Sequence, residues 1–510
     1  MTAPARFMPA AGARKFAGLA AIAAVALAAV LERLPHLGNW PSGYRMTIEF
    51  DSADAARTIW ISLTGQHGTW QQAWMDNHVG RFIEPPVIQT LTALTYLPDG
   101  VERPWTSQLF GIAFWFAAAA ILFVTMRRRS DRWGAALSAG YLLLAPFAVI
   151  VSANFQVEPI MVFTFALLLW YAGRGDVTQG RRFVIAAVLG MVAGLVKPGA
   201  LLPFVVAIYF VSAFEDASPT SFRDRRRWAR LVALIAIAAL PAFAYAFLII
   251  PSQVGDKVLP QLLWDPSFYV GWARMIYKVV GIVPLVGAVA GFILAPRMRL
   301  LGLALGACYL GYSAIFTWHT MTHEYYQVPL MVIVAIGLGG LGEWLAAALQ
   351  RVARSRALAV AGGFAIAVAL TFVVVPRGQT GETPGRFPDQ DRFAAIGQTV
   401  GPGSWVVAYT PNYGRPLEYY GRILTDVWPT PADEDYQAEI GWQPETIQQR
   451  LTAFIELNHP RYFVLTELSS DTQSLVTFLD TGYPLVQSGP NLRIYDLTKP
   501  LKSGLPGSGG

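Results

Sequence analysis

The stretch from Trp105 to Arg129, WTSQLFGIAFWFAAAAILFVTMRRR, decides the fold class of this 510-residue chain. Its apolar part reaches the length of about 20 residues that an α-helix needs to cross the hydrocarbon core of a bilayer. Three arginines follow at once, and short loops with an excess of Lys and Arg lie on the cytoplasmic side of a membrane. The stretch therefore predicts a transmembrane helix that ends in the cytoplasm.

The composition of the whole chain supports a membrane protein. Hydrophobic residues make up 54% and charged residues only 14% of the sequence, whereas soluble proteins carry about 25% charged residues. This excludes an ordinary soluble globular protein and predicts a mainly α, polytopic membrane protein with about eleven transmembrane helices. The predicted spans are 16–34, 105–126, 133–152, 157–173, 183–196, 199–214, 231–250, 279–296, 300–318, 328–349 and 357–376.

The distribution of basic residues predicts the orientation. A cytoplasmic N-terminus places 20 of the 39 Lys and Arg residues on short inner loops, against five acidic residues, and eleven crossings then leave the C-terminus outside. The net charge of +6 therefore comes from many separate loops. Because nucleic-acid binding requires a basic patch or stripe, we expect no nucleic-acid partner. Cys308 is the only cysteine, which excludes an intrachain disulfide and a cysteine-based metal motif.

The same reasoning predicts the domains. Residues 1–376 form the transmembrane domain, including a first outer loop over 35–104 with short interfacial helices. Four tryptophans in this loop are expected at headgroup depth: Trp40, Trp60, Trp70 and Trp74.

Residues 377–502 differ in composition from the helices before them, with ten basic and fifteen acidic residues from 377 to the C-terminus. Strand patterns alternate there with helical patterns, which predicts an extracytoplasmic α/β domain. The strand patterns cover 404–409, 461–465 and 492–496, and the helical patterns cover 388–399, 444–457 and 470–481. Residues 503–510 have linker composition and are expected to be a flexible tail or an added remnant.

Carboxylates, cations and an aromatic cluster collect on the segments predicted to lie outside. They comprise Asp51, Asp54, Arg81, Glu84, Glu158, Lys197, Arg274, His323, Tyr325 and Tyr326. Charges at the ends of apolar helices are costly and mark an ion pair or a functional site. This set fits the transfer of a group from a lipid-borne phosphate, in which a carboxylate acts as general base and Lys or Arg neutralises the phosphate.

Several segments in order resemble the GT-C glycosyltransferases that use polyprenyl-phosphate sugars, especially the aminoarabinose transferases and protein O-mannosyltransferases. The matching segments are Arg33-Leu34-Pro35, Asp51 through Arg57, Glu84-Pro85-Pro86-Val87, the octapeptide SANFQVEP from Ser152 to Pro159, GLVKP from Gly194 to Pro198, and HEYYQVP from His323 to Pro329. The resemblance implies the GT-C fold and an inverting sugar transfer outside the cytoplasm.

The resemblance also implies residue roles. Asp51 takes the place of the family's first-loop aspartate at the reaction centre, and Asp54, three residues on, can replace it. Glu158 matches a second acidic position, with a helix cap or an ion pair as its structural alternative. Lys197 matches a lysine near the donor phosphate.

Glu84 departs from the family, because aminoarabinose transferases have a lysine before the two prolines. Arg81 or Arg274 would then supply the further cation. His323, Tyr325 and Tyr326 are expected either to orient the substrate or to anchor the chain at the membrane surface.

Whether the protein binds a divalent cation is left open. His67, His78, Glu84 and Glu324 are of ligand type, but their spacing indicates no ligand set, and we assign no metal ligands.

The sequence thus predicts an inverting glycosyltransferase of the bacterial inner membrane. It would move a sugar from a polyprenyl-phosphate donor to an envelope lipid, glycan or protein. Two alternatives remain: an envelope lipid or glycan transporter, and a non-catalytic GT-C-like scaffold. The sugar, the acceptor, the lipid chain length and the oligomeric state are not predicted.

Overall fold

The structure is a computed structural model that describes residues 23–66, 68–78, 84–215, 219–249, 258–352 and 387–508. Its described residues divide into two compact units, each treated by itself. The helical unit comprises Met1–Gly38, Ile83–Pro85 and Gln108–Gly381, and the α/β unit comprises Asn39–Phe82, Pro86–Ser107 and Glu382–Gly510. The first loop is therefore grouped with the C-terminal segment, whereas the sequence-based boundaries assign it to the transmembrane domain.

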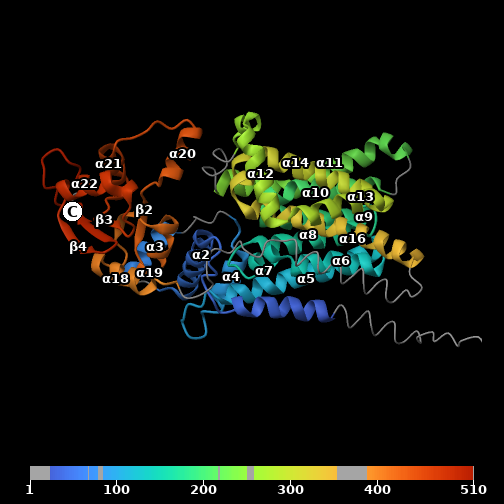
Figure 1. The fold of residues 1–510 in the computed structure, drawn as a ribbon, viewed down its shortest axis with the longest axis horizontal. Helices are drawn as coiled ribbons and strands as arrows, with labels where there is room; N and C mark the ends of the chain where they lie inside the picture. Colours follow the sequence, from blue (N-terminus) through green and yellow to red (C-terminus); the bar gives the residue numbers. More distant parts are fainter. Residues whose placement is uncertain are drawn as a thin grey trace, which may run out of the picture. The chain divides into compact units, whose positions relative to one another are not determined.

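Apolar helices build the helical unit (Figure 1). They are a helix over 23–33, α5 (Thr106–Arg129), α6 (Arg132–Leu144), α7 (Pro146–Ser152), α8 (Glu158–Ala172), α9 (Gly180–Val196), α10 (Pro198–Phe214), α11 (Arg225–Ala244), α12 (Pro266–Val279), α13 (Ile282–Leu294), α14 (Arg299–Ile315), α15 (Thr317–Thr322) and α16 (Val328–Val352). Helix α16 packs against α6 and α13, α9 packs against α11, and α10 packs against α14.

Glycines allow these helices to approach closely. A Cβ atom on Gly291 of α13 would overlap the backbone oxygen of Gly337 on α16, and one on Gly134 of α6 would overlap that of Gly339. Membrane helices pack through small residues in this way, because van der Waals contact rather than hydrophobic exclusion holds them together.

Only part of the predicted set of spans is tested by the described residues. Four of their helices are long and apolar enough to cross a membrane, namely Thr106–Arg129, Arg225–Ala244, Pro296–Ile315 and Glu324–Ala348. Two bent pairs raise this number to as many as six, and α8 and α10 are shorter apolar helices. The predicted span 357–376 lies outside the described residues. The total of eleven spans and the orientation stay predictions.

One predicted span is bent, and a second bend lies at the start of another. The stretch 133–152 breaks into α6 and α7 with a bend of 59°, because Pro146 lacks an N–H group and holds Ala145 out of the helical region. Helix α12 precedes the predicted span 279–296 and meets α13 at a bend of 89°. The bend lies at Gly281, whose φ of +79° favours glycine.

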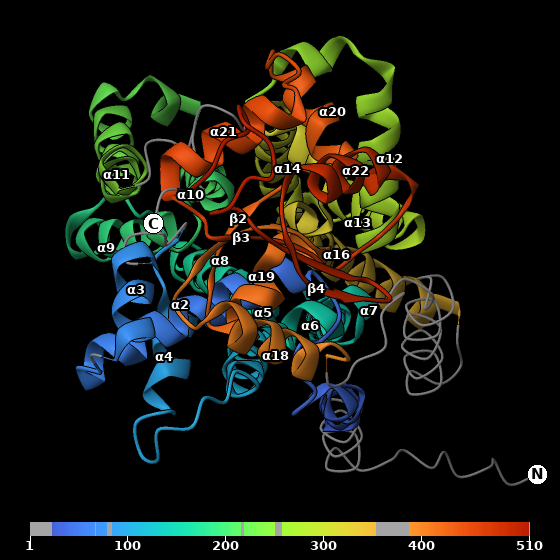
Figure 2. The same cartoon turned by 90° about the vertical axis from the view of Figure 1, so that its left-hand side faces the viewer.

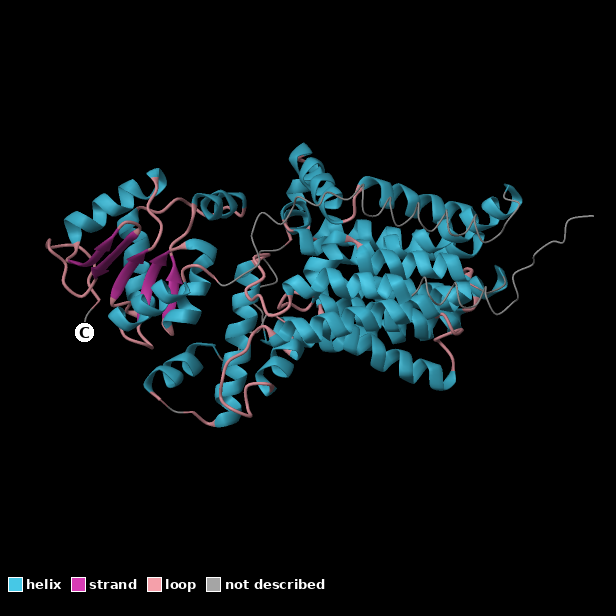
Figure 3. Ribbon diagram, turned by 60° about the horizontal axis from the view of Figure 1, so that its bottom comes forward, coloured by secondary structure: helices cyan, strands magenta, loops and turns pink. Residues whose placement is uncertain are grey.

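The α/β unit consists of a five-stranded sheet with helices on both faces (Figures 2 and 3). Its strands are β1 (Trp405–Tyr409), β2 (Leu424–Val427), β3 (Tyr462–Leu465), β4 (Leu485–Gly489) and β5 (Leu492–Asp496), in the order β2-β1-β3-β5-β4. The first three strands in this order are parallel, and β5 and β4 continue the sheet antiparallel.

Each face of the sheet has its own apolar layer. Helices α18 (Gln390–Val400) and α19 (Arg415–Gly421) cover the face that carries Val406 and Ile494. Helices α21 (Ile447–Asn458) and α22 (Gln473–Gly482) cover the opposite face, which carries Val407 and Phe463. The alternation of apolar residues along each strand thus fills both layers. The three predicted strands coincide with β1, β3 and β5.

The segment 503–508, expected to be a flexible tail or an added remnant, contacts this layered structure. Leu505 packs into the layer with α21 and α22. The Tyr483 hydroxyl donates a hydrogen bond of 2.6 Å to the carbonyl oxygen of Pro506, and Ser508 is buried. The apolar leucine gives the segment a buried anchor that its glycine and serine content conceals.

The first loop contributes α2 (Met46–Thr64), α3 (Thr69–His78) and α4 (Val87–Leu94). Helix α2 packs against α3, α4 and α19. Trp60 and Trp74 are buried inside the unit rather than free for the membrane surface, which corrects their expected role as interfacial anchors. The Trp74 ring stacks on His78, with 3.9 Å between the ring centroids.

Candidate functional site

The α/β unit brings the predicted reaction-centre residues together with residues of the C-terminal segment. We call Asp51, Asp54, His78, Arg415 and Glu418 the Asp51 cluster. Asp51 and Asp54 lie three residues apart, on one face of α2. The Nε atom of Arg415, at the start of α19, lies 2.8 Å from Oδ1 of Asp51, and its Nη1 atom lies 2.8 Å from Oε2 of Glu418.

The two aspartates differ in exposure. The Asp51 side chain is 35% exposed, whereas Asp54 is only 4% exposed and both of its carboxylate oxygens are buried. A general base must come within hydrogen-bond reach of the proton that it removes. Of the two carboxylates, Asp51 is therefore the more accessible to a molecule outside the unit.

The surroundings shift the pKa values of the two buried carboxyl groups, Asp54 and Glu418, in opposite directions. Burial raises the pKa of Asp54 well above its usual range, and the nearby charge of Glu418 adds to this effect, while Arg57 and Arg415 offset part of it. Burial also acts to raise the pKa of Glu418, but the His78 imidazole and Arg415 outweigh it and lower the pKa to about 2. Glu418 is therefore ionised at neutral pH, whereas Asp54 requires a proton or a further cation.

A second network of hydrogen bonds and ion pairs lies next to the cluster and connects the same two helices. Arg57 on α2 makes a bidentate ion pair with Glu102, with N–O distances of 2.9 to 3.1 Å. Its Nη1 atom donates to the backbone oxygen of Tyr419, and the guanidinium lies 3.9 Å from the centroid of that ring. The Tyr419 hydroxyl donates to Glu102 at 2.7 Å. This network fixes α2 against α19.

The helical unit contains a separate group of charges, which we call the Lys197 cluster: Glu84, Glu158, Lys197 and Tyr325. The Lys197 ammonium pairs with Oε1 of Glu158 and lies 3.8 Å from Oε1 of Glu84. It also lies 4.9 Å from the centroid of the Tyr325 ring. The ion pair that the sequence offered as a structural alternative for Glu158 is thus present, with Lys197 as the partner.

Proline chemistry places Lys197 and Glu158. Helix α9 ends at Val196 because Lys197 precedes Pro198 and is held in an extended conformation with ψ of 86°. Helix α10 then starts at Pro198, where the missing N–H group costs nothing. Glu158 starts α8, followed by Pro159, and a carboxylate is favourable at this positive end of a helix.

The aromatic residues near Tyr325 form a stacked group. Tyr326 stacks on Tyr312 with ring centroids 6.0 Å apart and lies 5.0 Å from His319. Nδ1 of His323 lies 2.6 Å from the Thr322 hydroxyl. Tyr312 is buried, whereas His319, His323, Tyr325 and Tyr326 are half-buried. Of these rings, Tyr325 lies beside Lys197.

The other predicted cations have different surroundings. Arg274 is exposed on α12, and no ion pair with it is present among the described residues. Arg81 and His67 lie outside the described residues. Arg33 is buried and donates to Ser152 Oγ and to the backbone oxygens of Ala29, Leu143 and Ala148, so it fixes helix ends.

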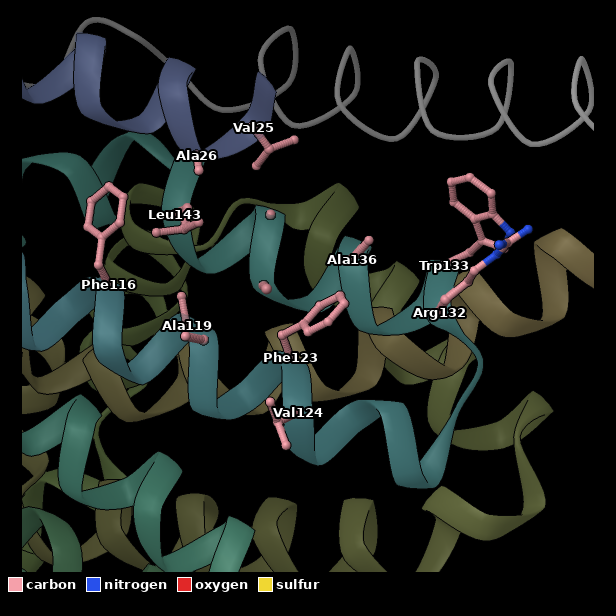
Figure 4. A pocket seen from close by; sticks show the side chains of 13 residues that line it. Val25, Ala26, Phe116, Ala119, Phe123, Val124, Arg132, Trp133, Ala136 and Leu143 are labelled. Atoms are coloured by element: carbon pink, nitrogen blue, oxygen red, sulfur yellow. The ribbon is translucent and has the colours of Figure 1, made fainter. Parts of the chain in front are cut away.

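An apolar cavity of about 320 Å³ lies in the helical unit beside the helix over 23–33, α5 and α6 (Figure 4). Its lining includes Val25, Phe116, Phe123 and Leu143, with Arg132 among the lining residues at one end. A hydrocarbon chain suits such a lining, whereas a sugar does not. This cavity is therefore not a site for sugar chemistry.

Comparison with solved structures shows the fold. ArnT from Cupriavidus metallidurans bound to undecaprenyl phosphate matches 98% of this chain and 100% of its own length, with a TM-score of 0.53 and 16% identity. An Archaeoglobus fulgidus oligosaccharyltransferase tethered with an acceptor peptide matches 95% of this chain and 74% of its own, with a TM-score of 0.55 and 12% identity. The chain has the GT-C fold.

A family comparison agrees with the GT-C fold. The family described as dolichyl-phosphate-mannose-protein mannosyltransferase matches residues 84–245, a segment that contains Glu84, Glu158 and Lys197. No curated protein matches the chain. The resemblance to GT-C enzymes inferred from the sequence motifs is confirmed.

The sequence did not predict that two residues of the C-terminal segment join the Asp51 cluster. Arg415 and Glu418 stand in the segment RPLEYYG, which starts with a proline at the first helical position after Gly414. Two opposite charges three residues apart, on a helix whose other residues are apolar, were the available signal. That signal names no partner, because Asp51 is more than 300 residues away in sequence.

Proposed function

We propose that this protein is an inverting glycosyltransferase that moves a sugar from a polyprenyl-phosphate donor to an acceptor hydroxyl of the cell envelope. The observation that carries the proposal is Lys197, a lysine with a side chain only 11% exposed, placed at a proline break between two apolar helices. A buried lysine in an apolar helical unit is costly unless it pairs with an anion. Glu158 supplies this anion in the structure. The matching ArnT was solved with undecaprenyl phosphate, which supports a lipid phosphate as the anion that pairs with Lys197 when substrate is bound.

We assign acceptor activation to Asp51. Its partly exposed carboxylate accepts the proton of the acceptor hydroxyl. The acceptor oxygen attacks the anomeric carbon on the side opposite the phosphate, and the bond from that carbon to the phosphate oxygen breaks. The polyprenyl phosphate leaves with both bonding electrons. One displacement of this kind inverts the configuration at the anomeric carbon.

We assign the donor phosphate to Lys197, with the exposed Arg274 and with Arg81 as further cations. Glu158 keeps the ammonium in place between substrate molecules. His323, Tyr325 and Tyr326 bind the substrate around it, and the Tyr325 ring already lies 4.9 Å from the ammonium. Glu84 binds the sugar of the substrate rather than its phosphate. Asp54 has a supporting role, since its oxygens are buried.

We place the active residues and the C-terminal domain on the extracytoplasmic side of a bacterial inner membrane. The support is the excess of Lys and Arg on the loops assigned to the other side, which sets orientation in multi-pass proteins.

Mass spectrometry of envelope glycans and lipids tests the proposal. Cells that lack the protein should lose one sugar from one envelope component, and the wild-type chain should restore it. Asp51→Asn and Lys197→Met should fail to restore it, whereas Asp76→Asn, which changes an exposed acid on α3, should succeed. Full restoration by both Asp51→Asn and Lys197→Met would overturn the proposal.

A further inference from the structure

Three buried side chains from three helices converge on one point in the α/β unit. Asp54 on α2, His78 on α3 and Glu418 on α19 are 4%, 5% and 0% exposed. Each offers an oxygen or nitrogen atom, and these three atoms lie within 4.8 Å of one another. Neither carboxylate oxygen of Asp54 has a hydrogen-bond partner in the part of the chain that the structure describes. A buried carboxylate thus faces the group with its lone pairs unused.

His78 also directs a lone pair into the group. Its Nδ1 atom lies 3.1 Å from the backbone oxygen of Trp74. A carbonyl oxygen only accepts, so this contact places a ring proton on Nδ1, and Nε2 offers its lone pair to a ligand whenever it carries no proton. Nε2 lies 3.1 Å from Oε1 of Glu418, yet the two atoms lack hydrogen-bond geometry.

Glu418 is oriented by contacts on its other oxygen. Its Oε2 atom accepts hydrogen bonds from Arg415 Nη1 at 2.8 Å and from the Thr425 hydroxyl at 3.4 Å. The Oε1 atom is therefore held toward His78. Metal-binding carboxylates and imidazoles are usually fixed in this way, by a hydrogen bond on the atom that does not bind the ion.

A cation explains the arrangement better than a proton does. A proton on Asp54 could be shared with only one of the two neighbouring acceptors, Nε2 of His78 or Oε1 of Glu418, and the other buried acceptor would be left unpaired. The nearby guanidinium groups are already engaged, Arg57 by Glu102 and Arg415 by Asp51 and Glu418. One divalent ion would accept all three lone pairs and supply the charge that Asp54 lacks.

We propose that Asp54, His78 and Glu418 bind a divalent transition-metal ion. One imidazole and two carboxylates match Zn²⁺ best, since Ca²⁺ and Mg²⁺ prefer oxygen ligands alone. The 3.1 Å between Nε2 of His78 and Oε1 of Glu418 is close to the spacing of about 3.4 Å for two ligands roughly 2.1 Å from a tetrahedral ion. The ion would tie α2 and α3 of the first loop to α19, whether or not the protein transfers sugars.

The first experiment uses the full-length wild-type chain, purified in detergent without a polyhistidine tag. After EDTA treatment and dialysis, Zn²⁺ is added, and bound metal is measured by mass spectrometry together with the midpoint of thermal unfolding. We expect about one Zn²⁺ per chain and an unfolding temperature that rises with Zn²⁺ but not with Mg²⁺, because a ligand that binds only the folded state stabilises it. The absence of saturable Zn²⁺ binding would overturn the proposal and leave Asp54 neutralised by a proton.

The second experiment assigns the ligands. Asp54→Asn, His78→Gln and Glu418→Gln should each lose the bound zinc and its thermal shift. Asp76→Asn and His459→Gln, which change exposed residues of the same unit, should keep both. If the ligand variants fail to fold, X-ray absorption of wild-type protein loaded with Zn²⁺ decides: we expect imidazole and oxygen ligands at about 2.0–2.2 Å. A sulfur ligand, or zinc retained by all three variants, would contradict the assignment.

Discussion

Asp51 and Asp54 show how two equivalent residues in the sequence become different in the structure. Both stand on α2 three residues apart, and the motif alone leaves the choice of base open. The structure separates them, because Asp51 is partly exposed beside Arg415 while Asp54 is enclosed with His78 and Glu418. The sequence offers both acids as candidates, but their accessibility depends on residues that approach from the C-terminal segment.

Glu84 gives a prediction for the Lys197 cluster. Its carboxylate lies 3.8 Å from the Lys197 ammonium, where it competes with a phosphate for the same charge. Replacing it by an amide in Glu84→Gln should raise the affinity for undecaprenyl phosphate by about threefold to tenfold, on the order of 1 kcal/mol. Binding of that lipid to the purified protein measures the change. Glu215→Gln is the control, since it removes an acid paired with Arg129. Unchanged or weaker binding by Glu84→Gln would exclude Lys197 as the phosphate ligand.

Glu102 gives a prediction for stability and pH. Burial acts to raise the pKa of Glu102, but Arg57 and Tyr419 outweigh it and lower the pKa below its ordinary value of 4.5. The pair therefore contributes stability that is fully present above pH 4.5 and is lost as the pH falls through the lowered pKa.

The variant Glu102→Gln leaves the Arg57 guanidinium buried without a counter-charge, which should cost about 3 kcal/mol near pH 7. The difference in unfolding free energy from wild type should shrink below pH 4.5. Denaturant unfolding at several pH values measures it. A difference that is the same at pH 7 and pH 3 would show that the ion pair is not its source.

At the scale of elements, local pattern predicts where helices and strands lie better than how they bend. Helices α5 and α16 and strands β1, β3 and β5 follow their predicted ranges within a few residues. The bend at Pro146 was not predicted, because an apolar run is continuous through a proline when hydropathy alone is considered. The bend at Gly281 lies at the predicted start of the span 279–296.

The α13–α16 contact gives a prediction at this scale. A Cβ atom on Gly291 would overlap Gly337 and lie 2.6 Å from the backbone nitrogen of Leu341, so the helices must separate. Gly291→Ala should lower thermal stability by roughly 1–3 kcal/mol. Gly306→Ala on α14 is the matched control: among the described residues, no atom outside the adjacent backbone of its own helix lies within 4 Å of its added Cβ. The control gains the same helix propensity, up to about 1 kcal/mol, without a clash. Equal stability of the two variants would exclude close packing at Gly291.

At the scale of the molecule, the single cysteine makes the proposed orientation testable. In a Cys308→Ser background, Ser470→Cys marks an exposed position of the α/β unit and Arg128→Cys marks the end of α5. A membrane-impermeant maleimide should label Ser470→Cys in right-side-out vesicles and Arg128→Cys only in inverted vesicles. Labelling with the reverse sidedness would overturn the orientation and the extracytoplasmic site.

The sequence by itself determined the membrane character, the GT-C resemblance and the choice of charged residues, because hydropathy, basic loops and short motifs are local properties of the chain. Only the tertiary structure decided which charges meet: Lys197 with Glu158, Asp51 with Arg415, and Asp54 with His78 and Glu418. The physical reason is that burial and ion pairing depend on segments far apart in sequence, as where Arg57 reaches the backbone of Tyr419. A local pattern names such residues but not their partners.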